Sequence, residues 1–147
     1  ALRPRLVRDA AFVAASPDYA AMLRAAERRA ADWARVRPGE RIELDGVQLD
    51  FLAPDSAWTA GLDDPNEAST ILRVQFGAHA MLFTGDAELA LERQLLQRAN
   101  ARDLDVDLLK VAHHGSITSS TEAFLDAVTP RIALVSVGRD NTYGHPS

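Results

Sequence analysis

The chain has 147 residues, of which 47% are hydrophobic and 25% charged, which is the usual composition of one globular domain. No apolar run reaches the length of a membrane span, and the lack of cysteine excludes a disulfide framework and a cysteine-ligated zinc site. The formal net charge of −5 excludes a general positive field for nucleic acid, so such a role requires a local attraction or a metal.

The N-terminal region predicts a short strand followed by a helix. Apolar pairs within residues 1–15 indicate one short strand at most. Ser16 and Pro17 form a helix start, because serine can cap free amides and proline fits the first helical position. Apolar residues recur at spacings of three and four through residues 18–36, so we expect one helix that ends at Val36 and packs by one face.

Two hairpins are predicted next, separated by a polar loop. Residues 41–52 alternate apolar and polar side chains around Asp45-Gly46, which is a strong two-residue turn signal. Residues 53–66 predict a polar loop, and loops of this length are uncommon unless they are functional or mobile. The apolar stretches within residues 69–84 predict the second hairpin, which turns at Gly77-Ala78.

After residue 86 the pattern changes to helices alternating with buried strands. We expect a helix over 87–100, a buried strand over 106–112, a helix over 119–128 and a buried strand over 132–137. Ser119 and Glu122 have the spacing of a capping box for the second helix. Nearly continuous apolar strands between helices indicate an α/β fold in which helices cover at least one face of a sheet.

Side chains that can bind metal follow three successive predicted strands where each strand ends. Asp86 follows the strand that ends at Thr84, His113-His114 follows the next strand, and His145 follows the last. The carboxyl-terminal ends of strands form the edge at which open α/β sheets bind ligands, and neighbouring strands are close enough to share an ion. Imidazole and carboxylate are ligands for zinc, manganese or iron, so this edge is a candidate metal site.

Each candidate residue also has an ordinary structural explanation. Asp86 could cap the helix predicted to begin at Ala87. Turn or loop formation could explain the others, namely His113, His114, His145, Asn66 and Ser69. His79 lies beside a hairpin turn, away from this edge, and is interpreted as a surface residue. The coincidence of the remaining groups at one predicted edge favours a functional site.

Four motifs then carry a resemblance to a known family, in the order DPNEAST, LFTGDAE, LLKVAHHGSITSS and VSVGRDNTYGHPS. Over roughly residues 39–147 they closely resemble the metallo-β-lactamase-like domain of the ComEC family of DNA-internalisation competence proteins and its standalone relatives. The resemblance implies a four-layered αββα sandwich with two divalent metal ions, zinc or manganese, at one edge between two sheets.

The resemblance also implies a function and a setting. The expected activity is metal-dependent hydrolysis, by a phosphodiesterase or nuclease that acts on DNA during uptake. The expected partners are DNA or another phosphodiester, and the membrane channel domain of the parent protein. The domain would then lie outside the cytoplasm, attached to an inner-membrane protein.

Residue roles follow from the resemblance, position by position. Asp86 is similar to the carboxylate that bridges two metals, and His114 to a ligand of the second metal. His113 would support that ligand or contact the substrate phosphate, and the two histidines could exchange these roles. The other candidates also line the catalytic cleft: Asn66 and Ser69 stand where many superfamily members have another metal-binding histidine, and His145 resembles a late histidine of the cleft.

One departure from the family pattern limits the expected chemistry. The signature His-any-His-any-Asp-His supplies most of the metal ligands in the superfamily, and the sequence does not contain it. Catalytic zinc takes about three protein ligands plus water, so these residues alone cannot complete a two-metal site. We therefore expect residues 1–147 to be the C-terminal portion of a single domain, with the signature upstream. The alternative is a catalytically degenerate binding or scaffold domain that has lost its metals.

Overall fold

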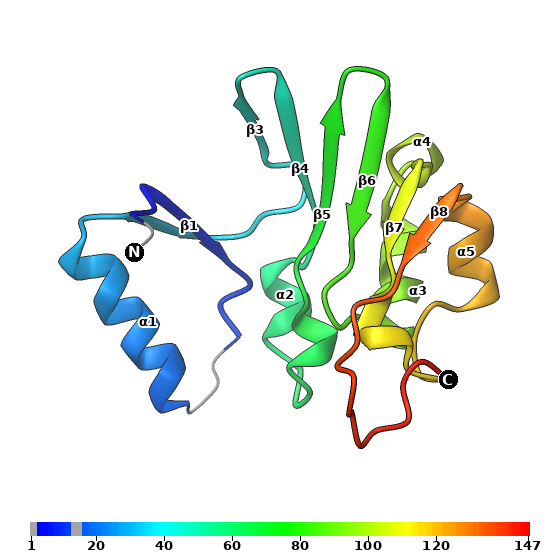
Figure 1. Ribbon diagram of the computed structural model, residues 1–147. Coiled ribbons are helices and arrows are strands. Elements are labelled where there is room, and N and C mark those ends of the chain that lie inside the picture. The colour runs from blue at the N-terminus through cyan, green and yellow to red at the C-terminus, as the bar shows by residue number, and fades with distance from the viewer. Residues whose placement is uncertain (1–2, 13–15) are drawn as a thin grey trace.

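The computed structural model describes residues 3–12 and 16–147, and its strands form two sheets. The smaller sheet pairs β1 (Leu6–Asp9) with β2 (Asp32–Arg35) in parallel, and α1 (Pro17–Arg28) connects the two strands. The larger sheet has six strands in the order β3-β4-β5-β6-β7-β8. Figure 1 shows the smaller sheet and α1 at one side of the larger sheet and α5 (Glu122–Val128) at the other. The predicted α/β fold class is confirmed.

The six-stranded sheet begins antiparallel and ends parallel. Its antiparallel strands are β3 (Arg41–Leu44), β4 (Val47–Ala53), β5 (Ile71–Phe76) and β6 (His79–Phe83), which confirm both predicted hairpins. Asp45 and Gly46 both have a left-handed backbone, with φ of 47° and 82°, as a type I′ hairpin turn requires. The parallel strands β7 (Leu108–Lys110) and β8 (Ile132–Leu134) follow beyond β6.

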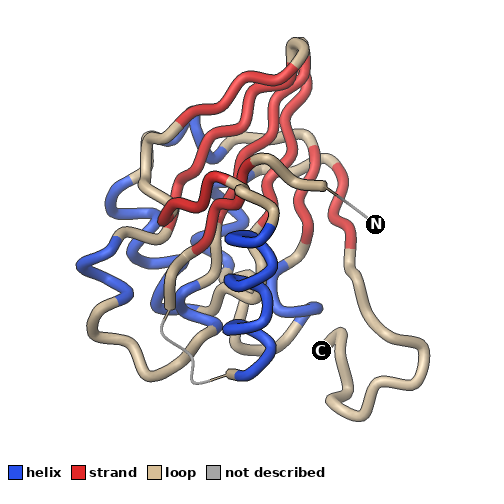
Figure 2. The backbone as a smooth tube through the Cα atoms, turned by 90° about the vertical axis from the view of Figure 1, so that its left-hand side faces the viewer, coloured by secondary structure: helices blue, strands red, loops and turns tan. Residues whose placement is uncertain are grey.

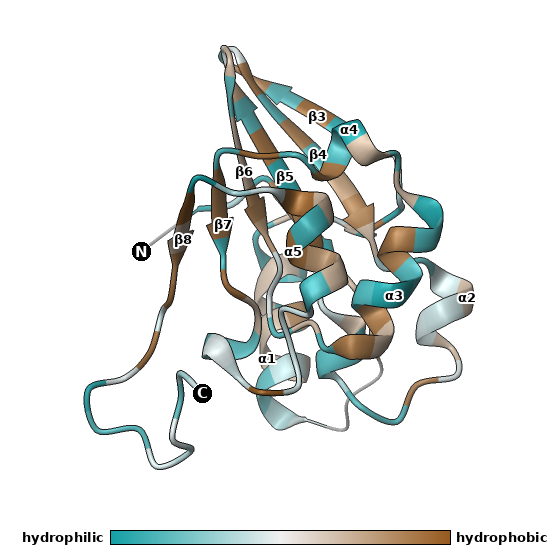
Figure 3. Ribbon diagram, turned by 90° about the vertical axis from the view of Figure 1, so that its right-hand side faces the viewer, coloured by the Kyte–Doolittle hydropathy of each residue, from teal (hydrophilic) through white to brown (hydrophobic). Residues whose placement is uncertain are grey.

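Helices cover one face of this sheet and seal the core. Figure 3 shows α3 (Leu89–Arg98) and α5 together on that face, with the short α4 (Ala101–Leu104) after α3. Leu82 of β6 and Leu109 of β7 are both 0% exposed and pack in one cluster with Leu91 of α3 and Phe124 of α5. This burial fixes β6 and β7, and therefore the side chains that follow their ends. No helix in the described ranges is long and apolar enough to cross a membrane.

The first predicted helix is shorter than the sequence indicated. It begins as expected, with Pro17 in its first turn and the Ser16 hydroxyl accepting a hydrogen bond from the Tyr19 amide at 3.4 Å. It ends at Arg28, because Ala30 turns the chain with a φ of 51° and the next residues form β2. Hydrogen bonds to the N-terminal strand therefore override the helical spacing in residues 32–36. The single short strand expected near the N-terminus is β1; residues 13–15 lie outside the described ranges.

A partly buried tyrosine links α1 to β1. The Tyr19 hydroxyl donates a hydrogen bond of 2.6 Å to Asp9 Oδ2. Burial, and then this hydrogen bond to a carboxylate, raise the pKa of Tyr19 to about 12, because both favour the neutral phenol. The N-terminal unit is therefore held by a specific polar contact as well as by strand pairing.

The predicted loop over 53–66 contains helical structure that the sequence reading did not anticipate. Residues Ser56–Thr59 form α2, which the Asp55 carboxylate caps by accepting a hydrogen bond of 2.7 Å from the Trp58 amide. Asn66–Ala68 form the 3-10 helix η1. The Trp58 indole donates to the Glu67 carbonyl at 2.8 Å, so this segment closes on itself as a compact unit beside the site edge.

The predicted capping box at Ser119 is wrong. The cap of α5 is Thr121, whose hydroxyl accepts from the Phe124 amide at 3.3 Å. The supporting carboxylate comes from α3: Glu92 is 2% exposed and accepts hydrogen bonds from the Ser120 amide (2.5 Å) and from the Thr121 amide (2.9 Å) and hydroxyl (2.8 Å). Capping therefore depends on a contact between helices that local spacing cannot reveal.

The last two strands differ from their predicted form. The strand expected over 106–112 is shorter, because Ala112–Gly115 turn into the 3-10 helix η2. The strand expected to be buried over 132–137 is β8, an edge strand in which Ile132 is 53% and Leu134 46% exposed. β8 pairs with β7, but the residues that pack against the helices in the core come from strands such as β6 and β7 and not from β8.

Candidate metal centre

The candidate site lies at the edge where β6, β7 and β8 end. These three strands are parallel neighbours, so the segments that follow them leave the sheet at one edge, at the bottom of the view in Figure 1. β6 leads into Gly85 and Asp86, and β7 into η2. β8 leads into a C-terminal segment, residues 135–147, which returns to η2 through a hydrogen bond of 2.9 Å from the Ser147 amide to the Gly115 carbonyl.

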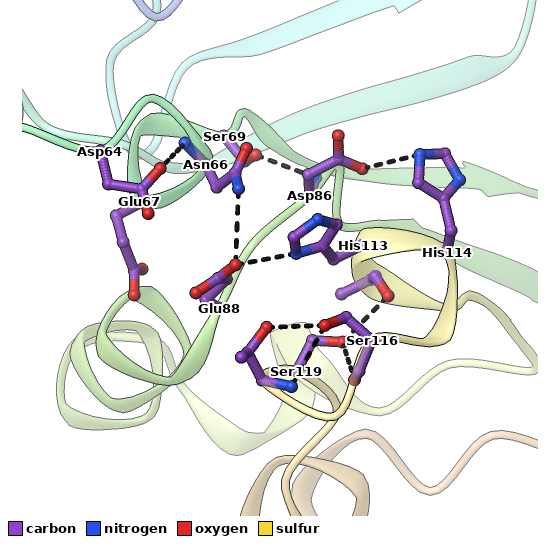
Figure 4. Close-up of polar contacts among 12 residues, drawn as sticks. Asp64, Asn66, Glu67, Ser69, Asp86, Glu88, His113, His114, Ser116 and Ser119 are labelled. Carbon is purple, nitrogen blue, oxygen red and sulfur yellow. Dashed lines mark hydrogen bonds and ion pairs between the residues drawn. The ribbon is translucent and has the colours of Figure 1, made fainter. Parts of the chain in front are cut away.

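Asp86 and His114 form the central pair of this edge. His114 Nε2 lies 3.6 Å from Asp86 Oδ1, and both side chains are nearly half exposed, at 45% and 42%. His114 Nδ1 lies 2.6 Å from the Ser136 carbonyl oxygen, which can only accept, so Nδ1 carries the proton and Nε2 is the nitrogen that offers a lone pair in the neutral ring. A carbonyl on one ring nitrogen is the usual way to orient a metal-binding histidine. Figure 4 shows the two side chains pointing toward one another.

Backbone contacts hold Asp86 in place. The Ser69 hydroxyl accepts a hydrogen bond of 2.9 Å from the Asp86 amide. Gly85 has a φ of 56°, and a Cβ at this position would lie 2.9 Å from the Ser69 side chain, so only glycine fits. The Lys110 ammonium donates to the Gly85 carbonyl at 2.8 Å and lies 3.8 Å from Asp86 Oδ1. The carboxylate therefore has a cation beside it without a direct hydrogen bond.

The histidines stand on a strained turn. His113 and His114 have φ of 44° and 54°, the left-handed region, and Gly115 follows with a φ of 80°. A left-handed backbone costs a residue with a side chain about 1–2 kcal/mol. Such strain is concentrated at functional sites, and here it directs two consecutive rings to the same edge of the sheet.

His113 belongs to a second cluster beside the pair. Its Nδ1 lies 2.8 Å from Glu88 Oε1, at ion-pair distance but off the line of a hydrogen bond. Asn66 Nδ2 donates to the same carboxylate oxygen at 3.4 Å. The structure thus brings Asn66 and Ser69 to the predicted edge, Asn66 on Glu88 and Ser69 on Asp86, as Figure 4 shows.

His145 comes from the C-terminal segment and completes the cluster. Its ring centroid lies 5.6 Å from that of His113, and its Nδ1 is buried with no hydrogen-bond partner in the described residues. His79, interpreted as a surface residue, is 78% exposed at the start of β6, the opposite end from this edge, where its only near carboxylate in the described ranges is Asp107 at 3.5 Å.

The alternative role for Asp86 as a helix cap is not what the structure shows. α3 begins at Leu89 with Glu88 in the cap position, and the carboxylate that caps its free amides is Glu67, at 3.0 Å from the Ala90 amide and 2.6 Å from the Leu91 amide. Asp86 is therefore free of structural hydrogen bonds through its carboxylate in the described residues.

Three residues of this edge were missed by the sequence reading. They are Glu88, Lys110 and Ser136. Glu88 is two residues from Asp86 in the motif TGDAE, so its acid type and position were an available signal. Lys110 precedes the histidines but lies inside an apolar strand. Ser136 acts through its backbone carbonyl, so its residue type gives no signal of this role.

The donor set fits part of a metal centre. Asp86 and His114 present one carboxylate oxygen and one free imidazole nitrogen to the same point, a ligand chemistry that suits zinc or manganese. Within residues 3–12 and 16–147, however, no three His, Cys, Asp or Glu side chains gather closely enough to hold an ion. These residues therefore fit two ligands of a site that needs at least three.

The family is decided by a comparison with protein-family models. The model of the metallo-beta-lactamase superfamily matches residues 9–139. The chain belongs to the metallo-beta-lactamase superfamily. The match runs from the last residue of β1 into the C-terminal segment, so it includes β2 to β8 and all the residues of the Asp86–His114 pair and its supports.

Curated relatives of this chain belong to the ComEC family that its motifs resemble. Competence protein ComA of Neisseria gonorrhoeae is 40% identical over 108 residues, 74% of this chain and 15% of that protein. ComE operon protein 3 of Bacillus subtilis is 30% identical over 142 residues, 97% of this chain and 18% of that protein. Recombination protein 2 of Haemophilus influenzae is 36% identical over 101 residues, 69% of this chain and 12% of that protein. The chain thus spans less than a fifth of the length of these relatives.

Among solved structures, the chain is similar to CmlA, a diiron beta-hydroxylase from Streptomyces venezuelae. The TM-score is 0.46 at 13% identity, over 73% of this chain and 26% of that one. Its E377D mutant gives a TM-score of 0.49 with the same identity and coverage.

Proposed function

We propose that this domain contributes two ligands, Asp86 and His114, to the metal centre of a hydrolase that cleaves phosphodiester bonds of DNA during uptake. The observation that carries the proposal is the geometry of this pair. Two potential ligands from different strand ends face one point, both are solvent-accessible, and the Ser136 carbonyl fixes the imidazole in the form that can bind a metal.

The neighbouring residues have complementary roles in this proposal. Ser69 and the left-handed Gly85 hold the backbone of Asp86, so its carboxylate needs no movement to meet an ion. His113 and His145 line the same edge, where their ring N–H groups would donate hydrogen bonds to phosphate oxygens. Lys110 adds a fixed positive charge. A bound divalent ion would supply a hydroxide at neutral pH and offset charge on the phosphoryl oxygen.

The substrate and setting are inferred from the relatives. Two are named as competence proteins or operon products and one as a recombination protein, which favours DNA over other phosphodiesters. The net charge of −5 means that attraction to the phosphate backbone must be local, at this edge. We place the domain outside the cytoplasm, in a membrane-attached parent; a fused alkaline phosphatase reporter that stays inactive would contradict this placement.

Hydrolysis of bis-p-nitrophenyl phosphate by the full-length natural protein tests the proposal, together with metal content. We expect Asp86→Ala and His114→Ala each to reduce metal content and to lower the rate at least about 100-fold, because each removes a ligand. His79→Ala is the matched control, since it removes an imidazole at the far end of β6 and should leave both unchanged. Equal rates and metal content in all four proteins would refute the proposal.

A second candidate is a binding or scaffold domain without metals. The observation that favours it is the lack of a third ligand within the described ranges. In that case the wild-type protein would hold no metal and release no p-nitrophenol, while still binding DNA. The same experiment therefore separates the two functions.

A further inference from the structure

A row of aromatic rings leads from solvent to the Asp86–His114 pair. The ring centroids of His114 and His113 lie 6.3 Å apart, those of His113 and His145 5.6 Å, and those of His145 and Tyr143 5.9 Å. The outermost ring, Tyr143, is 82% exposed, whereas the ring beneath it has a buried nitrogen. The row thus ends in a large aromatic side chain presented to solvent.

Hydrogen bonds hold the turn that carries the exposed ring. Asn141 brackets the turn that carries it: its Oδ1 accepts from the His145 amide at 3.1 Å, and its Nδ2 donates to the His145 carbonyl at 3.0 Å and the Gly138 carbonyl at 3.2 Å. Tyr143 lies nearly parallel to the His145 ring, with an interplanar angle of 11°. The tyrosine ring therefore lies alongside His145, and most of its surface is open to solvent.

From this arrangement we infer that Tyr143 is a stacking platform for a nucleobase of single-stranded DNA whose backbone lies at the Asp86–His114 edge. The inference rests on the proposed function and adds the kind of strand that the site accepts. Aromatic rings beside a backbone-binding groove are the way proteins hold single strands without regard to sequence, because every base has a π face. A paired base inside a duplex has no free face to offer, so this platform selects unpaired strands.

Binding to two labelled 12-nucleotide strands by fluorescence anisotropy tests the inference with the full chain. One strand is oligo(dT) and the other has the same phosphates with abasic sugars, so the charge is equal and only the bases differ. We expect the wild type to bind oligo(dT) about tenfold more tightly, which is the range of one base–aromatic stack. Tyr143→Ala should bring the two affinities to within about twofold, while Tyr143→Phe keeps the preference because the ring remains.

Controls separate this inference from the proposed hydrolysis. Phe76→Ala removes another exposed aromatic ring, 65% exposed at the far end of the sheet, and should keep the preference. Asp86→Ala should also keep it while abolishing hydrolysis, so a wild type that prefers oligo(dT) but cleaves nothing would overturn only the proposed activity. A wild type that binds neither strand, or binds both equally, or a preference that survives Tyr143→Ala, would overturn the platform.

Discussion

Gly115 is the position where one added methyl group should separate the C-terminal segment from the metal-site turn. Its φ of 80° is left-handed, and a Cβ would lie 2.8 Å from the Pro146 Cβ, closer than side chains approach. In Gly115→Ala the left-handed backbone costs about 1–2 kcal/mol. The overlap can be relieved only by moving Pro146 away, which breaks the hydrogen bond from the Ser147 amide to the Gly115 carbonyl, worth about 1 kcal/mol.

The expected loss in the free energy of unfolding is therefore about 2–3 kcal/mol relative to a control. Gly138→Ala is that control, because a Cβ there meets no atom within 4 Å and its φ is outside the left-handed region. In both variants, replacing glycine with alanine stabilises the protein slightly by reducing the conformational entropy of the unfolded chain. This contribution cancels when the two free energies of unfolding are subtracted. Urea denaturation followed by circular dichroism measures both. If the two variants unfold within about 0.5 kcal/mol of each other, the close approach of Gly115 to the C-terminal segment is refuted.

Three further predictions concern stability and titration. Glu92→Ala should lower the free energy of unfolding by about 3–5 kcal/mol in urea denaturation, because it removes the carboxylate from three partly buried donors of Ser120 and Thr121 at the start of α5. Glu122→Ala, in the first turn of α5, should cost less than about 1 kcal/mol, so equal losses would contradict the cap. The raised pKa of Tyr19 stabilises the fold fully below pH 10, and that stability is lost as the pH rises toward about 12. Ultraviolet titration should show one tyrosine that ionises near this higher pH. If the same high-pH ionisation persists in Tyr19→Phe, the assignment to Tyr19 is wrong. The hydrogen bond from the Ala80 amide, and then the charge of His79, hold the pKa of Asp107 below its usual value. This stabilises the fold above about pH 4, and the stability is lost as the pH falls. The melting temperature of Asp107→Asn should therefore fall less steeply at acid pH than that of the wild type.

Prediction from the sequence succeeded where local pattern and final structure agree. Asp45-Gly46 has the residue types that favour a type I′ turn of a two-residue hairpin, so β3 and β4 were placed almost to the residue. Ser16-Pro17 likewise marked the start of α1. These signals act over a few residues, and nothing elsewhere in the chain competes with them.

Prediction failed where a distant partner decides the local structure. Residues 32–35 have helical spacing, yet β1 lies close enough to pair with them, and strand hydrogen bonds win. Thr121 caps α5 in place of the predicted Ser119, because the Glu92 carboxylate of α3 accepts hydrogen bonds at that end of α5. In both cases the competing contact comes from an element far away in sequence, which periodicity and propensity do not encode.

For the candidate site, the sequence by itself determined the residue types and the edge: a carboxylate and histidines directly after successive strands, in the order of four family motifs. Only the tertiary structure decided which of them meet. The separation of 3.6 Å between Asp86 and His114, the Ser136 carbonyl that sets the imidazole tautomer and the contact of His113 with Glu88 all depend on how three parallel strands align. The sequence gives the chemistry of each side chain directly. The distances between strand ends depend on the register of the sheet, which is set by the packing of side chains in the core.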